Sequence, residues 1–167
     1  MEFPSNQNRL DGHFQDLMLH RIHDILLVAS PYDAFILEED GRLTEQILHE
    51  YLGMNLSYAP RVWQANTASY AMDLLSRRSV DLVIVMMRIS DMDLITFGTQ
   101  VKELYKNKPI ILLAFDESEI KQLPEDRDQF MDNVFVWTGN SSVFPAIIKY
   151  IEDSKNVKRD TRKGDVR

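Results

Sequence analysis

Few residues of this 167-residue chain have the types and spacing that catalysis or metal binding requires. His20 and His23 lie three residues apart, but a protein metal site takes three or four ligands and only these two are visible. The chain has no cysteine, which excludes thiol catalysis, thiolate zinc sites and a disulfide scaffold. It also has no Ser–His–Asp order, HExxH, GxSxG, Walker A or GxGxxG motif. We therefore expect no catalytic residues, no metal and no cofactor.

Five short apolar runs predict the strands that must position any remaining polar residues. Three of the runs are almost continuously apolar, which is typical of strands buried on both faces of a parallel sheet. The runs are Ile25–Ala29, Arg61–Ala65, Leu82–Met87, Ile110–Phe115 and Val134–Trp137.

Segments with a helical apolar period separate these runs. They predict helices around residues 43–52, 68–75, 94–104, 120–123 and 143–151. The expected N-caps are Asn66 or Thr67, Asp93, Asp116, and Ser141 or Ser142. Alternating strands and helices at this spacing predict a flavodoxin-like (βα)5 fold, an α/β doubly wound parallel sheet with strand order 2-1-3-4-5.

The charge of the chain is unevenly distributed. The segment 155–167 holds six bases and two acids, a net charge of +4, so the other 154 residues carry −11 of the total of −7. We expect residues 154–167 to be an exposed helix extension or linker. The composition agrees equally well with a domain excised from a longer protein and with a frayed natural C-terminus. Residues 1–22 form an N-terminal extension in which Phe14, Leu17 and Met18 predict an amphipathic helix, and residues 23–153 form the domain.

The composition also bounds location and partners. An acidic chain lacks the clustered Lys and Arg that phosphate contacts need, so we expect no nucleic-acid partner. No stretch approaches the ~18–20 apolar residues of a membrane span. The N-terminus has no basic region followed by an apolar run, as a signal peptide would have. We expect a cytoplasmic protein without a membrane partner.

Several polar residues fall near the ends of the predicted strands or in the loops that follow them. We interpret Asp91 and Asp93 as caps of the next helix, and Glu38-Glu39-Asp40 before Gly41 as a solvated turn in the loop after the first strand. A set of other polar residues could contact a small ligand or cofactor there, as an alternative function. These residues are Ser30, Asp33, Arg88, Ser90 and Thr138–Asn140.

The segment Asp81–Asp93, DLVIVMMRISDMD, resembles the third strand and following loop of the receiver (CheY-like) domains of bacterial response regulators. The runs ILLVAS, KPIILLAF and NVFVWTG resemble their first, fourth and fifth strands in the same order. The resemblance covers roughly His23–Asp153. It implies that the chain is a regulatory domain of two-component signal transduction and phosphorelay and is not an enzyme.

The chain departs from the receiver pattern wherever that family does its chemistry. Ala29 and Ser30 stand in place of the Mg²⁺-binding acidic pair, and Met86 in place of the aspartate that accepts the phosphoryl group. Ala114 replaces the hydroxyl residue and Trp137 the lysine. Because Met86, Ala114 and Trp137 are all apolar, we expect them to pack together and fill the former site. The resemblance therefore implies a degenerate pseudo-receiver, although phosphorylation of Asp91 or Asp93 stays open.

A module without phosphorylation would act through protein contacts. The resemblance implies an interaction face on the last two helices and last strand, with an output domain in the same polypeptide, a partner protein or a homodimer as partner. The expected face comprises Ile120, Phe130, Phe135, Phe144, Lys149 and Tyr150. The block HDILLVASPYDAFILEEDGRLTEQI also resembles, more weakly, the N-terminal region of large bacterial proteins that carry phosphoenolpyruvate synthase or pyruvate-phosphate-dikinase-type domains.

Overall fold

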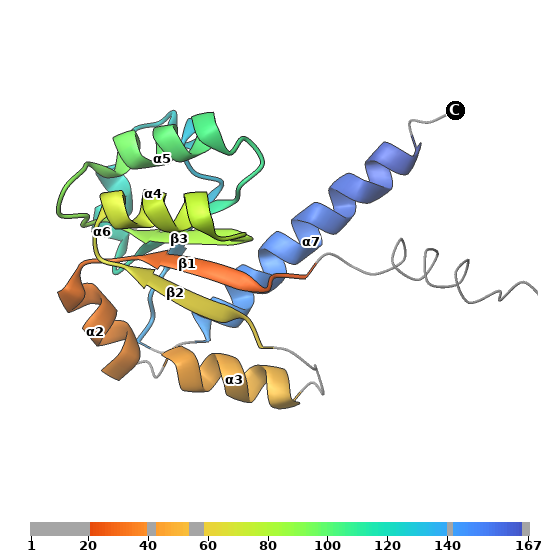
Figure 1. The fold of residues 1–167 in the computed structure, drawn as a ribbon, viewed down its shortest axis with the longest axis horizontal. Coiled ribbons are helices and arrows are strands. Elements are labelled where there is room, and N and C mark those ends of the chain that lie inside the picture. The colour runs from red at the N-terminus through yellow and green to blue at the C-terminus, as the bar shows by residue number, and fades with distance from the viewer. Residues whose placement is uncertain (1–20, 40–42, 54–58, 140–141, 165–167) are drawn as a thin grey trace, which may run out of the picture. The chain divides into compact units, whose positions relative to one another are not determined.

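The computed structural model describes residues 21–39, 43–53, 59–139 and 142–164 (Figure 1). Residues 1–20, with the predicted N-terminal helix and His20, lie outside the described residues, as do Asp40, Asn140 and Ser141. Residues Ile22–Ile151 form one compact unit. Arg21 and the described residues from Glu152 onward belong to a second unit, in which Arg21 and Glu152 make an ion pair at 3.8 Å.

A five-stranded parallel sheet in the order β2-β1-β3-β4-β5 forms the centre of the compact unit, which confirms the predicted topology. Strand β1 pairs with β2 on one side and with the central strand β3 on the other; Ile25, for example, lies opposite Val62 and Leu82. The strands are β1 (Asp24–Val28), β2 (Arg61–Ala65), β3 (Leu82–Met86), β4 (Ile110–Ala114) and β5 (Asn133–Val136).

Helices cover both faces of the sheet because its inner strands are apolar on both sides (Figure 1). Successive residues of β3 alternate between two hydrophobic clusters, one holding Leu82, Ile84 and Met86 and the other Val83 and Val85. The first cluster includes residues of α2 (Pro31–Glu39), α3 (Leu43–Gly53) and α7 (Val143–Gly164). The second includes residues of α4 (Ala68–Arg77) and α5 (Leu94–Leu104).

The connection between β1 and β2 differs from the prediction, because it holds two helices where the periodicity indicated only one. Glu38 and Glu39 end α2 and do not belong to a loop. The sequence did not reveal α2 because the apolar residues of this helix point to both its buried and its exposed side and form no periodic stripe. Ala34 and Leu37 are buried, while Phe35 is exposed.

The predicted helix caps agree with the structure at three helices. Thr67 caps α4, Asp93 caps α5, and Asp116 caps the short α6 (Glu117–Lys121). The carboxylate of Glu119 in turn accepts a hydrogen bond from the backbone N–H of Phe115 at 2.8 Å, which completes a reciprocal arrangement close to a capping box. A 3-10 helix, η1 (Arg127–Gln129), follows before β5.

Candidate functional site

The carboxyl ends of the strands are closed by apolar side chains. Met86 is the last residue of β3 and only 1% exposed, and Ala114 is the last residue of β4 and fully buried. Ala29 follows β1 and Trp137 follows β5, and both are buried. This edge of the sheet is where open α/β folds usually bind ligands, so its apolar filling bears directly on function.

The indole of Trp137 anchors this filling. It packs edge-on against Phe144, with ring centroids 6.3 Å apart, and both residues share one hydrophobic cluster with Met86. The backbone N–H of Trp137 donates to the carbonyl of Ala114 at 2.7 Å, which keeps the residue in line with β4. Met86 and Trp137 therefore share one hydrophobic cluster, whereas Ala114 is buried but belongs to neither cluster. That the three side chains together fill a former phosphorylation site stays a prediction.

Ser30 and Asp33 lie together at the start of α2. The hydroxyl of Ser30 accepts a hydrogen bond from the backbone N–H of Asp33 at 3.1 Å, and its carbonyl accepts one from Ala34 at 2.9 Å. Asp33 is the only polar or charged residue that is buried within the described part of the chain. Its Oδ1 atom has no hydrogen-bond donor among the described residues.

Arg88 supplies the charge that faces this buried carboxylate. It follows β3 by two residues, and its Nη2 lies 3.6 Å from Oδ1 of Asp33, while 65% of its side chain is exposed. An ionised carboxylate cannot be buried cheaply without a countercharge, so Arg88 compensates for the burial of Asp33. Ser30, Asp33 and Arg88, which were expected near the same strand ends, are thus brought together.

Asp91 and Asp93 are engaged in structural contacts. Asp93 accepts hydrogen bonds from the backbone N–H and the hydroxyl of Thr96 in α5. The prediction that Asp91 caps α5 is wrong. Its carboxylate instead accepts hydrogen bonds from the backbone N–H groups of Ala68 at 2.7 Å and Ser69 at 3.0 Å, at the start of α4.

These hydrogen bonds favour the ionised forms of both carboxyl groups. The pKa of Asp91 is lowered from 3.8, chiefly by the backbone N–H groups of Ser69 and Ala68. The pKa of Asp93 is lowered from 3.8, chiefly by the side chain and then the backbone of Thr96. The loop after β3 is therefore tied at three points: to α2 through Arg88, to α4 through Asp91 and to α5 through Asp93.

The remaining described ligand candidates, Ser90, Thr138 and Gly139, do not line the groove between α3 and β2. Ser90, Thr138 and Gly139 are exposed, and Gly139 has a φ of +89° that favours glycine. A groove of about 470 Å³ lies between α3 and the start of β2, lined by residues such as Ile47, Leu48 and Val62. No group of three His, Cys, Asp or Glu side chains with metal-site geometry occurs within the described ranges.

The predicted interaction face is only partly at the surface. Phe130 and Phe144 are 4% and 1% exposed, so both contribute to the core and offer almost no area to a partner. Ile120 and Phe135 are partly exposed, and Lys149 and Tyr150 are exposed. The rings of Phe135 and Tyr150 meet edge to face with centroids 5.7 Å apart, which joins β5 to α7 at the surface.

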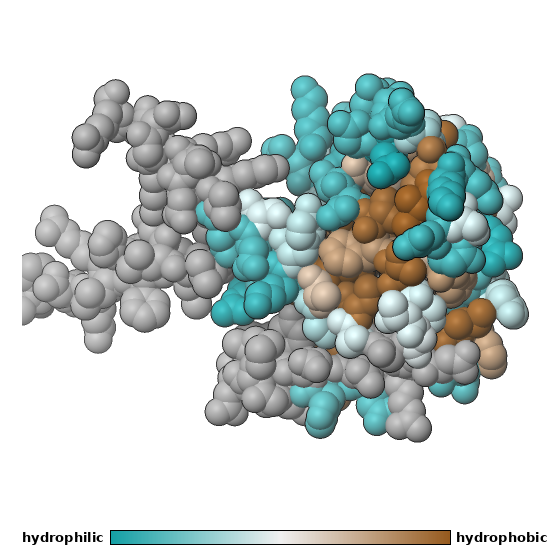
Figure 2. Space-filling model, turned by 180° about the vertical axis from the view of Figure 1, so that it is seen from behind, coloured by the Kyte–Doolittle hydropathy of each residue, from teal (hydrophilic) through white to brown (hydrophobic). Residues whose placement is uncertain are grey.

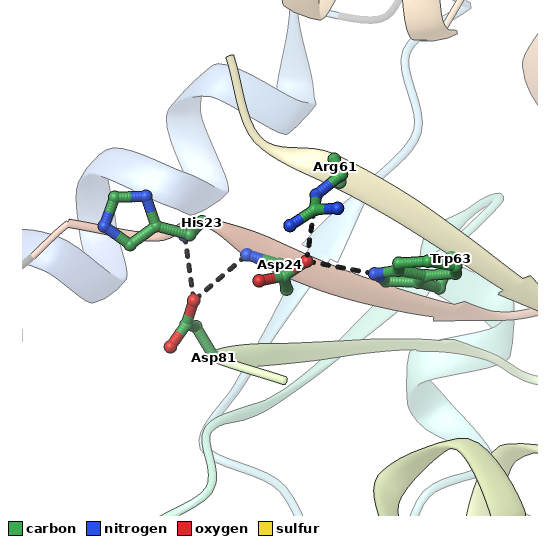
Figure 3. A network of polar contacts seen from close by, with 5 residues as sticks. All are labelled: His23, Asp24, Arg61, Trp63 and Asp81. Atoms are coloured by element: carbon green, nitrogen blue, oxygen red, sulfur yellow. Dashed lines mark hydrogen bonds and ion pairs between the residues drawn. The ribbon is translucent and has the colours of Figure 1, made fainter. Parts of the chain in front are cut away.

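A polar network at the opposite end of the sheet was not predicted (Figure 3). The carboxylate of Asp81 accepts hydrogen bonds from the backbone N–H groups of His23 at 2.9 Å and Asp24 at 3.0 Å. Asp24 accepts one from the indole N–H of Trp63 at 3.0 Å and pairs with Arg61 at 3.5 Å. The network holds the amino ends of β1, β2 and β3 together. It was not predictable because no short sequence motif indicates contacts between strands that are distant in sequence.

Comparisons with known proteins define the class of fold. No protein-family model matches the chain, and no curated protein is significantly similar to it in sequence. Many solved structures match, among them the signal receiver domain of an HD domain-containing protein from Pseudomonas fluorescens Pf-5. It is 20% identical with a TM-score of 0.56, and the match covers 86% of this chain and 96% of that one.

Two longer proteins give higher TM-scores. NtrX from Brucella abortus matches at a TM-score of 0.65 and 14% identity, over 85% of this chain and 29% of that one. A streptococcal redox sensor, described as evolved from two-component response regulators, matches at 0.64 and 16% identity, over 83% and 55%. The protein thus has the CheY-like receiver fold. Among the described residues, no helix has the length and hydropathy needed to span a bilayer.

Proposed function

We propose that this chain is a regulatory signal-transduction module with the receiver fold that works without aspartyl phosphorylation and without Mg²⁺. It transmits its signal through protein contacts, in a longer polypeptide or with a separate partner. The observation that carries the proposal is the burial of Met86 at the end of β3, in one apolar cluster with Trp137. A thioether offers neither the nucleophilic oxygen nor the hard ligand that phosphoryl transfer with Mg²⁺ requires.

The charges near Met86 support the same proposal. Positive charge at these strand ends comes from Arg88, which is held by the buried Asp33. Such an internal ion pair neutralises the carboxylate without a metal, so the loop after β3 does not depend on a bound cation for its position. The streptococcal redox sensor with this fold is described as evolved from response regulators, which shows that such a fold can be adapted to another task.

The test uses the two tryptophans as reporters. Mg²⁺, then beryllofluoride or acetyl phosphate, is added to the protein while tryptophan fluorescence and intact mass are followed. We expect no change in the emission of Trp137 at millimolar Mg²⁺ and no phosphoryl adduct. The Trp63→Phe variant assigns the signal to Trp137. Quenching of Trp137 by Mg²⁺, or a mass increase of one phosphoryl group, would refute the proposal.

One observation favours the alternative, a small-ligand module. The Oδ1 atom of Asp33 is buried without a hydrogen-bond donor, although Arg88 lies nearby. A ligand that donates a hydrogen bond to this atom would raise the melting temperature of the wild type and not of Asp33→Asn. A thermal-shift screen of small cationic and amide compounds with both proteins separates this alternative from the main proposal. The output module suggested by the weaker sequence resemblance stays a prediction.

A further inference from the structure

Strand β2 forms an outer edge of the sheet, and the groove of about 470 Å³ lies along that edge (Figure 1). Residues 59–63 line one wall of the groove, and α3 residues such as Ile47 and Leu48 line the other. Val62 packs against the hydrophobic cluster on the α3 side of the sheet, whereas Trp63 packs against the cluster on the α4 side. A groove that contacts both residues therefore opens onto the outer edge of the strand. We call this area the β2 edge and define it by Arg61, Val62, Trp63 and Gln64.

The backbone of β2 presents unpaired groups at this edge. The N–H of Arg61 donates to the carbonyl of His23 at 2.8 Å, and the carbonyl of Ala65 accepts from the first N–H after β1 at 3.1 Å, so both residues face β1. The peptide groups of successive residues in a strand point to opposite sides. Those of Val62 and Gln64 therefore point away from β1, where no described strand meets them. An open strand edge of this kind can pair with an extended segment of another protein.

A guanidinium group without a carboxylate partner lies beside the β2 edge. Arg78, which follows α4, stacks on the indole of Trp63 with its Cζ atom 3.9 Å from the ring centroid. Arg78 is exposed and forms no ion pair within the described part of the chain, whereas its neighbour Arg77 pairs with Asp73. A guanidinium that lies on an aromatic ring can still direct its N–H donors in its own plane towards a carboxylate.

The carboxylates that contact β2 are engaged within the chain. Asp24 pairs with Arg61 at 3.5 Å, and the same carboxylate accepts the indole N–H (Figure 3). Glu38 accepts a hydrogen bond from the side-chain amide of Gln64 at 3.2 Å, and Glu45 of α3 also has a partner. Among the described residues, the charge that these contacts leave available at the β2 edge is therefore the positive charge of Arg78.

The two faces of the β2 edge favour different side chains. In a strand paired with β2, a residue opposite Trp63 points to the α4 face and its neighbours point to the α3 face. A side chain opposite Trp63 thus meets Arg78, whereas one opposite Val62 meets Ile47 and Leu48, and Leu48 is 48% exposed. An acidic residue between two apolar ones satisfies both faces.

We infer that the β2 edge pairs with an extended segment of a partner protein in which apolar and acidic residues alternate. The inference rests on the proposed function, which it deepens by naming the partner's chemistry. Exposed apolar area alone does not single out this edge, because Figure 2 shows hydrophobic side chains gathered on the face seen from behind as well. A second copy of the chain fits less well, since two-fold pairing of two β2 edges would place both Arg78 side chains on one face.

Two single variants with equal net charge test the inference in the full chain. Arg78→Glu changes the β2 edge, and Lys121→Glu changes an exposed base of α6, which contacts β4. Each replaces one positive charge by one negative charge and so lowers the net charge from −7 to −9. The probe is a short, blocked, fluorescently labelled peptide in which Val and Glu alternate, and a second peptide carries Lys in place of Glu. Fluorescence polarisation measures the dissociation constants at low and physiological salt.

We expect Arg78→Glu to weaken binding of the Glu peptide by about tenfold or more and Lys121→Glu by about threefold or less. The Lys peptide should bind the wild type about tenfold more weakly than the Glu peptide. Equal weakening in both variants would show that net charge alone attracts the peptide. That result, or equal binding of the two peptides, overturns the inference.

Amide hydrogen exchange locates the bound peptide. The N–H groups of Val62 and Gln64 should exchange fast in the free protein and slowly in the complex, while that of Arg61 is protected in both. Unchanged exchange at Val62 and Gln64 overturns the inference. Protection of these groups in the free protein that is lost on dilution also overturns it, because a second copy then occupies the edge. Only the Mg²⁺ and phosphoryl-donor experiment above can overturn the proposed function, so the two failures are distinguishable.

Discussion

Arg88 reaches from the loop after β3 to α2, where its Nη2 atom lies 3.6 Å from Oδ1 of the buried Asp33. The pair is asymmetric, since Asp33 is 1% exposed and the side chain of Arg88 is 65% exposed. The carboxylate therefore depends on the guanidinium far more than the reverse. The pair joins α2, which follows β1, to the loop after the neighbouring strand β3, and its two residues are 55 positions apart along the chain.

Removal of Arg88 should therefore destabilise the protein more than removal of the charge of Asp33. We expect Arg88→Gln to lower the free energy of unfolding by about 1–2 kcal/mol, since it leaves a buried carboxylate without a countercharge while solvent screens part of the loss. In the double variant with Asp33→Asn, part of this loss should be recovered. Urea unfolding of the four proteins measures the coupling, and strictly additive effects would contradict the interpretation.

Restoring an acid at the end of β3 should not restore a receiver. Met86→Asp places a carboxylate in an apolar cluster without a countercharge, which should lower the free energy of unfolding by about 3 kcal/mol or more at neutral pH. Met86→Leu keeps the volume and should cost less than about 1.5 kcal/mol. Denaturant unfolding compares the two, and mass spectrometry with acetyl phosphate should detect no adduct. Equal stability of both variants would show that the site is more open to water than its burial indicates.

Gly98 should be intolerant of a methyl group. A Cβ atom at this position would lie 2.5 Å from the carbonyl oxygen of Phe130, and that oxygen belongs to the backbone. We expect Gly98→Ala to lower the free energy of unfolding by about 1–3 kcal/mol. Thr99→Ala, at an exposed position of the same helix, is the control and should change it little. If thermal unfolding finds Gly98→Ala as stable as its control, the close approach of α5 to Phe130 is wrong.

Acid should weaken the caps of α4 and α5. The pKa values of Asp91 and Asp93 are lower in the folded protein than the ordinary 3.8, so the unfolded state binds more protons as the pH falls through this range. Their stabilisation is fully present above about pH 5 and decreases as the pH falls through 3.8 towards the lower folded-state values. The double variant Asp91→Asn/Asp93→Asn should show a shallower loss of stability in acid-denaturation curves. An unchanged slope would argue against both caps.

Much of the fold was predictable because its signals are local. The apolar runs identified all five strands, and their alternation with helices is compatible with few topologies. The caps at Thr67, Asp93 and Asp116 were also readable, since each side chain binds a backbone group three residues ahead. The helix α2 was not, because an element that is apolar all round has no period to detect.

The candidate site was predictable in its residue types and unpredictable in its contacts. The sequence by itself determined that an apolar residue, Met86, lies in the third apolar run where receivers carry an aspartate, and that no cysteine or catalytic motif is present. Only the tertiary structure decided that Asp33 is buried against Arg88, that Asp91 caps α4 and that Phe130 belongs to the core. The physical reason is that residue order sets local propensity, whereas a side chain's partner depends on which distant segments the packed sheet brings within a few ångströms.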